Sequence, residues 1–125
     1  MTSGVDWDSD PDFKKIRDQF IESFAEREKA LLEAIAAAPA SDEQIAKIRL
    51  VAHRLAGAAE SYGFAALTQV SGALDDWICS GQAKGASELL GQKTAMLARA
   101  LALARTSRQD PTGLLESAEY KALFR

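Results

Sequence analysis

The fold of this chain is decided by residues 41–64, which read SDEQIAKIRLVAHRLAGAAESYGF. Ser41, followed three positions later by Gln44, forms the capping box that marks the beginning of a helix, and Gly63 is the type of residue that ends one. Between these signals, apolar residues recur at alternating spacings of three and four, the period of an amphipathic α-helix. We therefore predict one helix with a single buried face, formed by Ile45, Ile48, Ala52, Leu55, Ala59 and Tyr62.

Three further segments have the same helical period. A long first helix is predicted over about residues 11–38; it begins with proline at its first position, after the N-cap Asp10, and is stopped by Pro39. A third helix is predicted over about 64–80 and a fourth over about 86–107. The apolar positions of these segments are Phe13, Ile16, Phe20, Phe24, Leu31 and Ile35, then Leu67, Val70, Leu74 and Ile78, then Leu89, Leu90, Met96, Leu97, Ala100, Leu101 and Ala104.

Four amphipathic helices with short connections bury one another best as antiparallel neighbours. The predicted fold is therefore all-α, an antiparallel up-down four-helix bundle within residues 10–125. Residues 1–9 lack a pattern and are expected to form a disordered N-terminal tail. A short C-terminal helix is expected to pack on the bundle, with a partner-binding tail as the alternative, from the apolar residues Leu114, Leu115, Tyr120, Leu123 and Phe124.

Composition and charge exclude several functional classes. The 125 residues suit one domain, and a net charge of -3 gives no general attraction to nucleic acid. No apolar run approaches the ~20 residues that span a bilayer, so no membrane segment is expected and the cytoplasm is the expected location. The single cysteine, Cys79, excludes an internal disulfide. Because it stands beside Trp77 and Ile78, we expect it to be a buried structural thiol.

His53 is the single histidine of the chain. A lone histidine on a helix is usually a core or surface residue without special chemistry. With a rotation of about 100° per residue, however, the apolar residues of this helix cluster on the side opposite to His53. We therefore predict that the imidazole projects into solvent from the middle of the helix.

The face around His53 carries small side chains where a solvent face usually carries long polar ones. It comprises Ala46, Leu50, Ala56, Gly57 and Glu60. A glycine inside a helix costs roughly 0.8–1.0 kcal/mol relative to alanine. Close contact with a neighbouring helix would explain Gly57, but this residue shares the face of the histidine. We interpret it as clearing space for a partner to approach the ring.

The chemistry of the imidazole suits group transfer. A neutral histidine is a good nucleophile near pH 7, because its reference pKa is about 6.5. Its phosphoramidate is a high-energy linkage that can be passed on. Arg49 and Arg54 lie close enough in sequence to screen phosphoryl oxygens, or they are ordinary solvated charges.

The segment His53-Arg54-Leu55-Ala56-Gly57, with Gly63 ten positions after the histidine, resembles the histidine-containing phosphotransfer (HPt) domain of bacterial two-component phosphorelays. The family pattern has an apolar residue two positions after the histidine, here Leu55, and usually a lysine followed by a glycine. This sequence departs from the pattern at Ala56, where the lysine would stand.

The resemblance implies that His53 accepts a phosphoryl group on Nε2 from a receiver-domain aspartyl phosphate and passes it to another receiver aspartate. Response-regulator receiver domains, or a hybrid histidine kinase, would be the partners, docking on the helix surface around His53. The receiver would supply the acidic pocket and Mg²⁺. The protein itself would be a monomeric phosphocarrier rather than an enzyme, with no ATP site, cofactor or metal of its own.

Two other functions are considered. A non-phosphorylated helical adaptor that binds a receiver domain or another signalling protein is favoured by Ala56. An enzyme that uses His53 as a general base is less well supported, since no second histidine exists and too few metal ligands lie around Glu60.

Overall fold

The computed structural model describes residues 10–36 and 40–124. Every regular element within these ranges is helical, which confirms the predicted all-α class. The predicted tail over residues 1–9 and the predicted stop at Pro39 lie outside the described residues. The elements are α1 (Pro11–Glu22), α2 (Phe24–Ala36), α3 (Asp42–Ala58), η1 (Ala59–Tyr62), α4 (Ala65–Cys79), α5 (Ser87–Ser107), η2 (Thr112–Glu116) and α6 (Ala118–Phe124).

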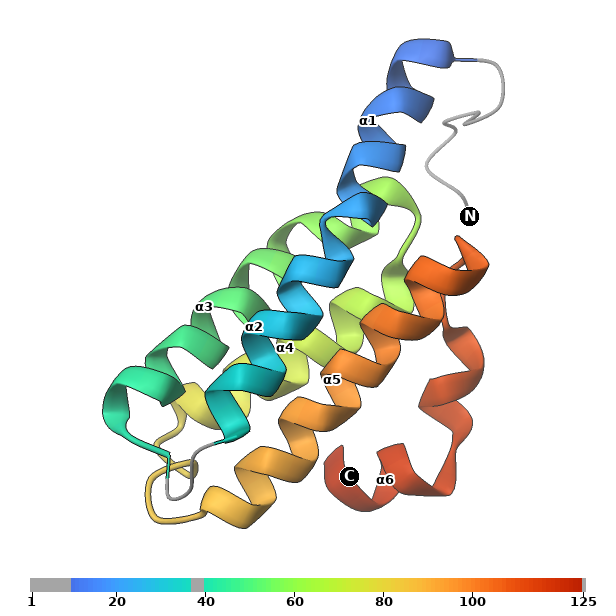
Figure 1. Cartoon of the computed structure of the whole chain (residues 1–125). Helices are drawn as coiled ribbons and strands as arrows, with labels where there is room; N and C mark the ends of the chain where they lie inside the picture. Colours follow the sequence, from blue (N-terminus) through green and yellow to red (C-terminus); the bar gives the residue numbers. More distant parts are fainter. Residues whose placement is uncertain (1–9, 37–39, 125) are drawn as a thin grey trace.

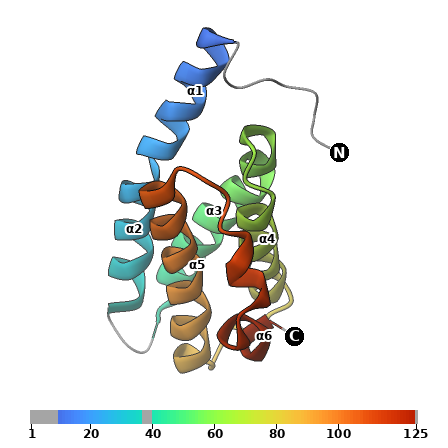
Figure 2. The same ribbon diagram turned by 90° about the vertical axis from the view of Figure 1, so that its right-hand side faces the viewer.

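Helices α2, α3, α4 and α5 form the bundle, and each runs antiparallel to the next in the chain (Figure 1). The most extensive packing joins α3 to α4 and α2 to α5. Helix α1 continues the direction of α2 and projects beyond the end of the bundle (Figures 1 and 2). The predicted antiparallel up-down bundle is therefore confirmed.

The core of the bundle consists of the apolar faces that the helical period predicted. Burying these side chains supplies the main favourable free energy of folding. Two predicted core positions are wrong: Ile16 is 48% exposed because it lies on the projecting α1, and Leu89 is 38% exposed in the first turn of α5. The largest fully buried side chains are Phe24, Phe64, Ile21, Leu31, Ile48, Leu55, Leu67, Leu74, Leu90, Leu97, Leu101 and Val70.

The predicted single helix over residues 11–38 is interrupted at Ser23, which separates α1 from α2. The hydroxyl of Ser23 donates a hydrogen bond to the Phe20 carbonyl at 2.6 Å. Its backbone N–H approaches the carbonyls of both Gln19 and Phe20, at 3.2 and 3.1 Å. A serine that bonds back to the preceding turn competes with the regular helical ladder, which accounts for the break.

The capping box predicted at the beginning of α3 is present, and the glycine predicted to end the helix follows η1 instead. The Ser41 hydroxyl accepts from the Gln44 N–H at 3.2 Å, and the Gln44 side chain accepts from the Ser41 N–H at 2.8 Å. At the other end the last turn tightens into η1, so α3 itself is shorter than predicted. Gly63 then adopts a φ of 87°, a left-handed conformation that glycine permits without a steric cost.

An aromatic cluster closes this end of the bundle. The Phe20 ring stacks on Tyr62 with a centroid distance of 4.6 Å, and Phe24 meets Phe64 edge-on at 5.5 Å. Phe13 of α1 also reaches Tyr62, at 5.8 Å. These contacts tie the N-terminal helices to η1 and so fix the end of α3 relative to α2.

The C-terminal segment packs on the bundle, as expected, because Leu114 and Tyr120 are buried. The buried Lys93 of α5 donates a hydrogen bond to the Leu123 carbonyl of α6. Asp110 caps α4, since its carboxylate accepts from the Ala66 N–H at 2.9 and 3.0 Å. The predicted short final helix is thus part of the folded domain.

Candidate functional site around His53

His53 lies in the middle of α3, and its side chain is 60% exposed. The opposite face of the helix is buried through Ile48, Ala52 and Leu55. The prediction from helical periodicity is therefore correct. The imidazole stands on the outer surface of the bundle, and Leu55 serves the core.

Asp75 of α4 holds one nitrogen of the ring. Its Oδ2 atom lies 2.9 Å from Nδ1 of His53. A carboxylate can only accept a hydrogen bond, so Nδ1 carries the proton and donates. Within the part of the chain that the structure describes, Nε2 has no hydrogen-bond partner. The contact therefore occupies Nδ1 and leaves Nε2 of a 60% exposed side chain available to a partner.

Arg49 and Cys79 complete a polar cluster with Asp75. The Arg49 Nε atom donates to the Cys79 sulfur at 3.2 Å and lies 3.3 Å from Asp75 Oδ1. The Cys79 thiol also donates to Asp75 Oδ1, at 3.5 Å. The contacts with Cys79, and then the charge of Asp75, raise the pKa of Arg49 above its ordinary value. Arg49 therefore stays cationic one turn from His53.

The predicted burial of Cys79 is wrong, since this residue is exposed. The prediction relied on its sequence neighbours Trp77 and Ile78. On the helix, however, Cys79 lies four residues after Asp75 and so shares its face rather than that of the buried Leu74 and Ile78.

Gly57 lies in open space one turn after His53. A Cβ atom built at Gly57 would meet no atom within 4 Å. The glycine is therefore not required by packing against a neighbouring helix, which supports the steric-access interpretation. Ala46, Leu50 and Glu60 are exposed on the same face.

Ala56 occupies a different position from the other members of the predicted docking surface. It is half-buried, and its Cβ lies 4.0 Å from the position that a Cβ on Gly72 of α4 would take. Ala56 therefore belongs to the contact between α3 and α4, at the edge of the exposed surface.

Arg54 lies on the other side of His53, toward α2. It is exposed and forms no ion pair among the described residues. Its charge acts on Arg27 of α2: burial, and then repulsion from Arg54, lower the pKa of Arg27. The two predicted supporting arginines, Arg49 and Arg54, thus flank the histidine on opposite sides.

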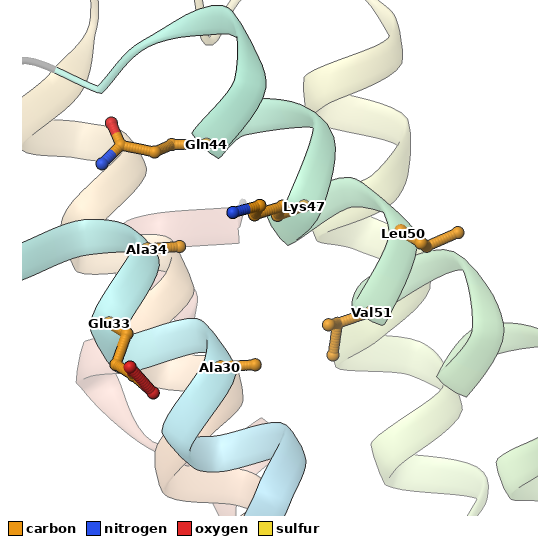
Figure 3. Close-up of a pocket in the computed structure, with 7 residues that line it drawn as sticks. All are labelled: Ala30, Glu33, Ala34, Gln44, Lys47, Leu50 and Val51. Atoms are coloured by element: carbon orange, nitrogen blue, oxygen red, sulfur yellow. The ribbon is translucent and has the colours of Figure 1, made fainter.

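A groove runs between α2 and α3 on the Arg54 side (Figure 3). Ala30 and Ala34 of α2 point toward α3, and Lys47 of α3 extends toward α2. Val51 and the 44% exposed Leu50 complete the apolar part of the lining. Glu33 and Gln44 also line this groove, so a partly apolar groove lies beside α3 on the side of α2.

The described ranges lack two further features, a metal-binding cluster and a membrane-spanning helix. No three His, Cys, Asp or Glu side chains gather there in an arrangement that could hold a metal ion. No helix there combines the length and apolar character needed to cross a bilayer.

The family model of the Hpt domain matches residues 15–106, which is most of the chain and includes His53, Asp75 and Gly57. The chain belongs to the Hpt domain family. Comparisons with curated proteins and with solved structures gave no significant match. Hpt domains are histidine-containing phosphotransfer modules of phosphorelays, and His53 is the single histidine of this Hpt domain.

Sequence reasoning assigned no site role to Asp75, which was noted only for its resemblance to the family's third helix, and none to Arg27. The fold brings Asp75 to His53 and Arg27 to the side of Arg54. The sequence pointed to Asp75 only weakly. This carboxylate follows the buried Leu74 by one position, so it lies at the edge of the buried face of α4, on the side next to α3. Arg27 gave no signal in the sequence, because its relation to Arg54 depends on how α2 packs against α3.

Proposed function

We propose that this Hpt domain is a phosphorelay intermediate in which Nε2 of His53 accepts a phosphoryl group from a receiver-domain aspartyl phosphate and passes it to another receiver aspartate. The observation that carries the proposal is the hydrogen bond of 2.9 Å between His53 and Asp75. This contact favours the tautomer with the proton on Nδ1, and it supports Nε2 of the exposed ring as the nucleophile.

In the proposed forward step, the Nε2 lone pair attacks the phosphorus atom of the aspartyl phosphate. The N–P bond forms while the bond from phosphorus to the aspartate oxygen breaks, and its electron pair remains on the partner's carboxylate. The proton on Nδ1 stays in place, so the ring gains positive charge. Asp75 stabilises that charge across the hydrogen bond. Transfer to the next aspartate reverses these bond changes.

The protein needs no cofactor of its own in this scheme. The receiver domain would bring the aspartate and a Mg²⁺ ion, which neutralises phosphoryl charge when bound. Gly57 leaves room for the approach of that domain, since nothing lies within 4 Å of its Cβ position. Arg49, which is paired with Asp75, lies one turn from His53 on the side where Ala56 replaces the usual lysine, and in this scheme it supports the phosphoryl group from within that pair.

The proposal is tested by incubating the protein with phosphorylated receiver domains and a labelled phosphate donor. We expect a label on the protein that is labile in acid and stable in base, as a phosphoramidate is. His53→Gln should abolish the label while leaving the circular-dichroism spectrum and melting midpoint unchanged. A label that survives this substitution would place the acceptor elsewhere.

The second candidate, an adaptor that binds a receiver without being phosphorylated, is favoured by the absence of a lysine at Ala56. It predicts equal receiver binding by the wild-type protein and His53→Gln, and no label on either. The labelling experiment therefore separates the two functions.

A further inference from the structure

Arg27 of α2 and Arg54 of α3 each lie one turn beyond a residue that lines the groove between these helices. Ala30 and Val51 line the same groove from opposite helices. Arg27 precedes Ala30 by three residues and Arg54 follows Val51 by three. Because α2 and α3 are antiparallel, both one-turn steps lead to the same end of the groove (Figures 1 and 3).

Neither guanidinium has a carboxylate partner in the part of the chain that the structure describes. The Nε of Arg27 donates to the Ser23 hydroxyl at 3.3 Å, and its guanidinium lies 5.9 Å from the centroid of the Phe20 ring. These contacts hold Arg27 in position and involve no carboxylate.

The juxtaposition is unfavourable in the isolated protein. Burial and the neighbouring charge of Arg54 both lower the pKa of Arg27, which means that they disfavour its cationic form. The repulsion between two like charges at one end of a groove falls when an anion binds near both. The pair is therefore suited to an anionic group that comes from outside the chain.

We propose that Arg27 and Arg54 together bind a carboxylate on the surface of the partner receiver domain, and thereby orient that domain over the α2 side of His53. The inference rests on the proposed phosphotransfer function. It adds Arg27 to the residues that contact the receiver, and it specifies that the receiver docks from the side of α2.

Charge and apolar surface both favour this side over the α4 side. A receiver presents an acidic phosphorylation pocket. On the α4 side it would meet Asp75 and the exposed Asp76, and Arg49 there is already paired with Asp75. On the α2 side it meets Arg27 and Arg54, which form no ion pair among the described residues, and the exposed Leu50 of the groove. The carboxylate of Glu33 also lines this groove, six residues along α2 from Arg27, together with the cation of Lys47. Complementary charge steers a partner to one face and disfavours the other.

The test is the affinity of unphosphorylated protein for the receiver that labels the wild-type protein, measured by titration at fixed low salt. Arg54→Gln and Arg27→Gln should each weaken binding by roughly tenfold. The double variant should weaken it by less than the product of the two, because both residues contact one group. Lys29→Gln is the matched control, since it removes one exposed cation from α2 away from the groove. Binding by either arginine variant that equals that of Lys29→Gln would overturn the proposal.

A second readout distinguishes docking from stabilisation of the phosphohistidine. The half-life of the phosphorylated protein alone should be the same for Arg54→Gln and wild type. A shortened half-life with unchanged affinity would assign the arginines to the phosphoryl group and overturn the inference. Failure of the proposed function appears separately, as a wild-type protein that binds a receiver but takes no label. If the arginine variants still weaken that binding, the docking assignment stands on its own; if no receiver labels or binds the wild-type protein, both proposals fall.

Discussion

Nδ1 of His53 on α3 lies 2.9 Å from Oδ2 of Asp75 on α4. The Asp75 side chain is only 13% exposed, whereas that of His53 is 60% exposed. A largely buried carboxylate held by Arg49 and Cys79 has little freedom to turn away. The ring of His53 is therefore oriented by the adjacent helix rather than by its own. This arrangement presents Nε2 outward in a fixed direction.

Replacing Asp75 with asparagine tests the contribution of its charge. The amide would retain the size of the side chain and an oxygen that accepts from Nδ1, but not the negative charge that stabilises the phosphorylated ring. Charge-assisted hydrogen bonds contribute roughly 1.5–3 kcal/mol, and solvent around the exposed ring reduces this value. We expect Asp75→Asn to slow phosphoryl transfer from the receiver by about tenfold, measured as an initial rate. Asp76→Asn, one position along α4, is the control. Equal rates for the two variants would remove Asp75 from the mechanism.

Substitutions at Gly57 should affect the approach of the receiver to His53 separately from the stability of the fold. A Cβ at Gly57 meets nothing within 4 Å, and the same holds for Gly91 in α5, away from the site. Gly57→Ala and Gly91→Ala should therefore each stabilise the fold by about 0.8–1 kcal/mol in denaturant unfolding. The longer side chain of Gly57→Gln should block the approach to His53 and slow transfer by roughly 100-fold. Normal transfer by Gly57→Gln would show that the partner does not need this space.

Cys79 should behave as a surface thiol. We expect a disulfide-exchange reagent to modify one thiol per chain in the native protein, with the same amplitude as in denaturant, because the residue is exposed. Cys79→Ser should change the free energy of unfolding by less than about 0.5 kcal/mol, as surface substitutions usually do. A thiol that reacts only after denaturation would mean that Cys79 is buried after all.

Much of this molecule follows from local sequence signals. The capping box at Ser41, the helical period of the apolar residues and the glycine after Tyr62 each act within a few residues, so the position of α3 was predictable. The exposure of His53 followed from the same period, because a histidine opposite the apolar stripe must face away from the core.

Sequence patterns alone did not show which side chains of neighbouring helices face each other. The helix is interrupted at Ser23 because its hydroxyl bonds back to the Phe20 carbonyl. A serine inside a helix can also point into solvent and leave the helix unbroken, so the residue type alone does not predict the interruption. The contact of His53 with Asp75, the exposure of Cys79 and the approach of Arg27 to Arg54 depend on the register and rotation with which helices pack. Those quantities are fixed by the fit of whole core faces, and no pattern within one helix encodes them. The helix and its outward histidine were thus determined by the sequence, while the tertiary structure decided which side chains surround that histidine.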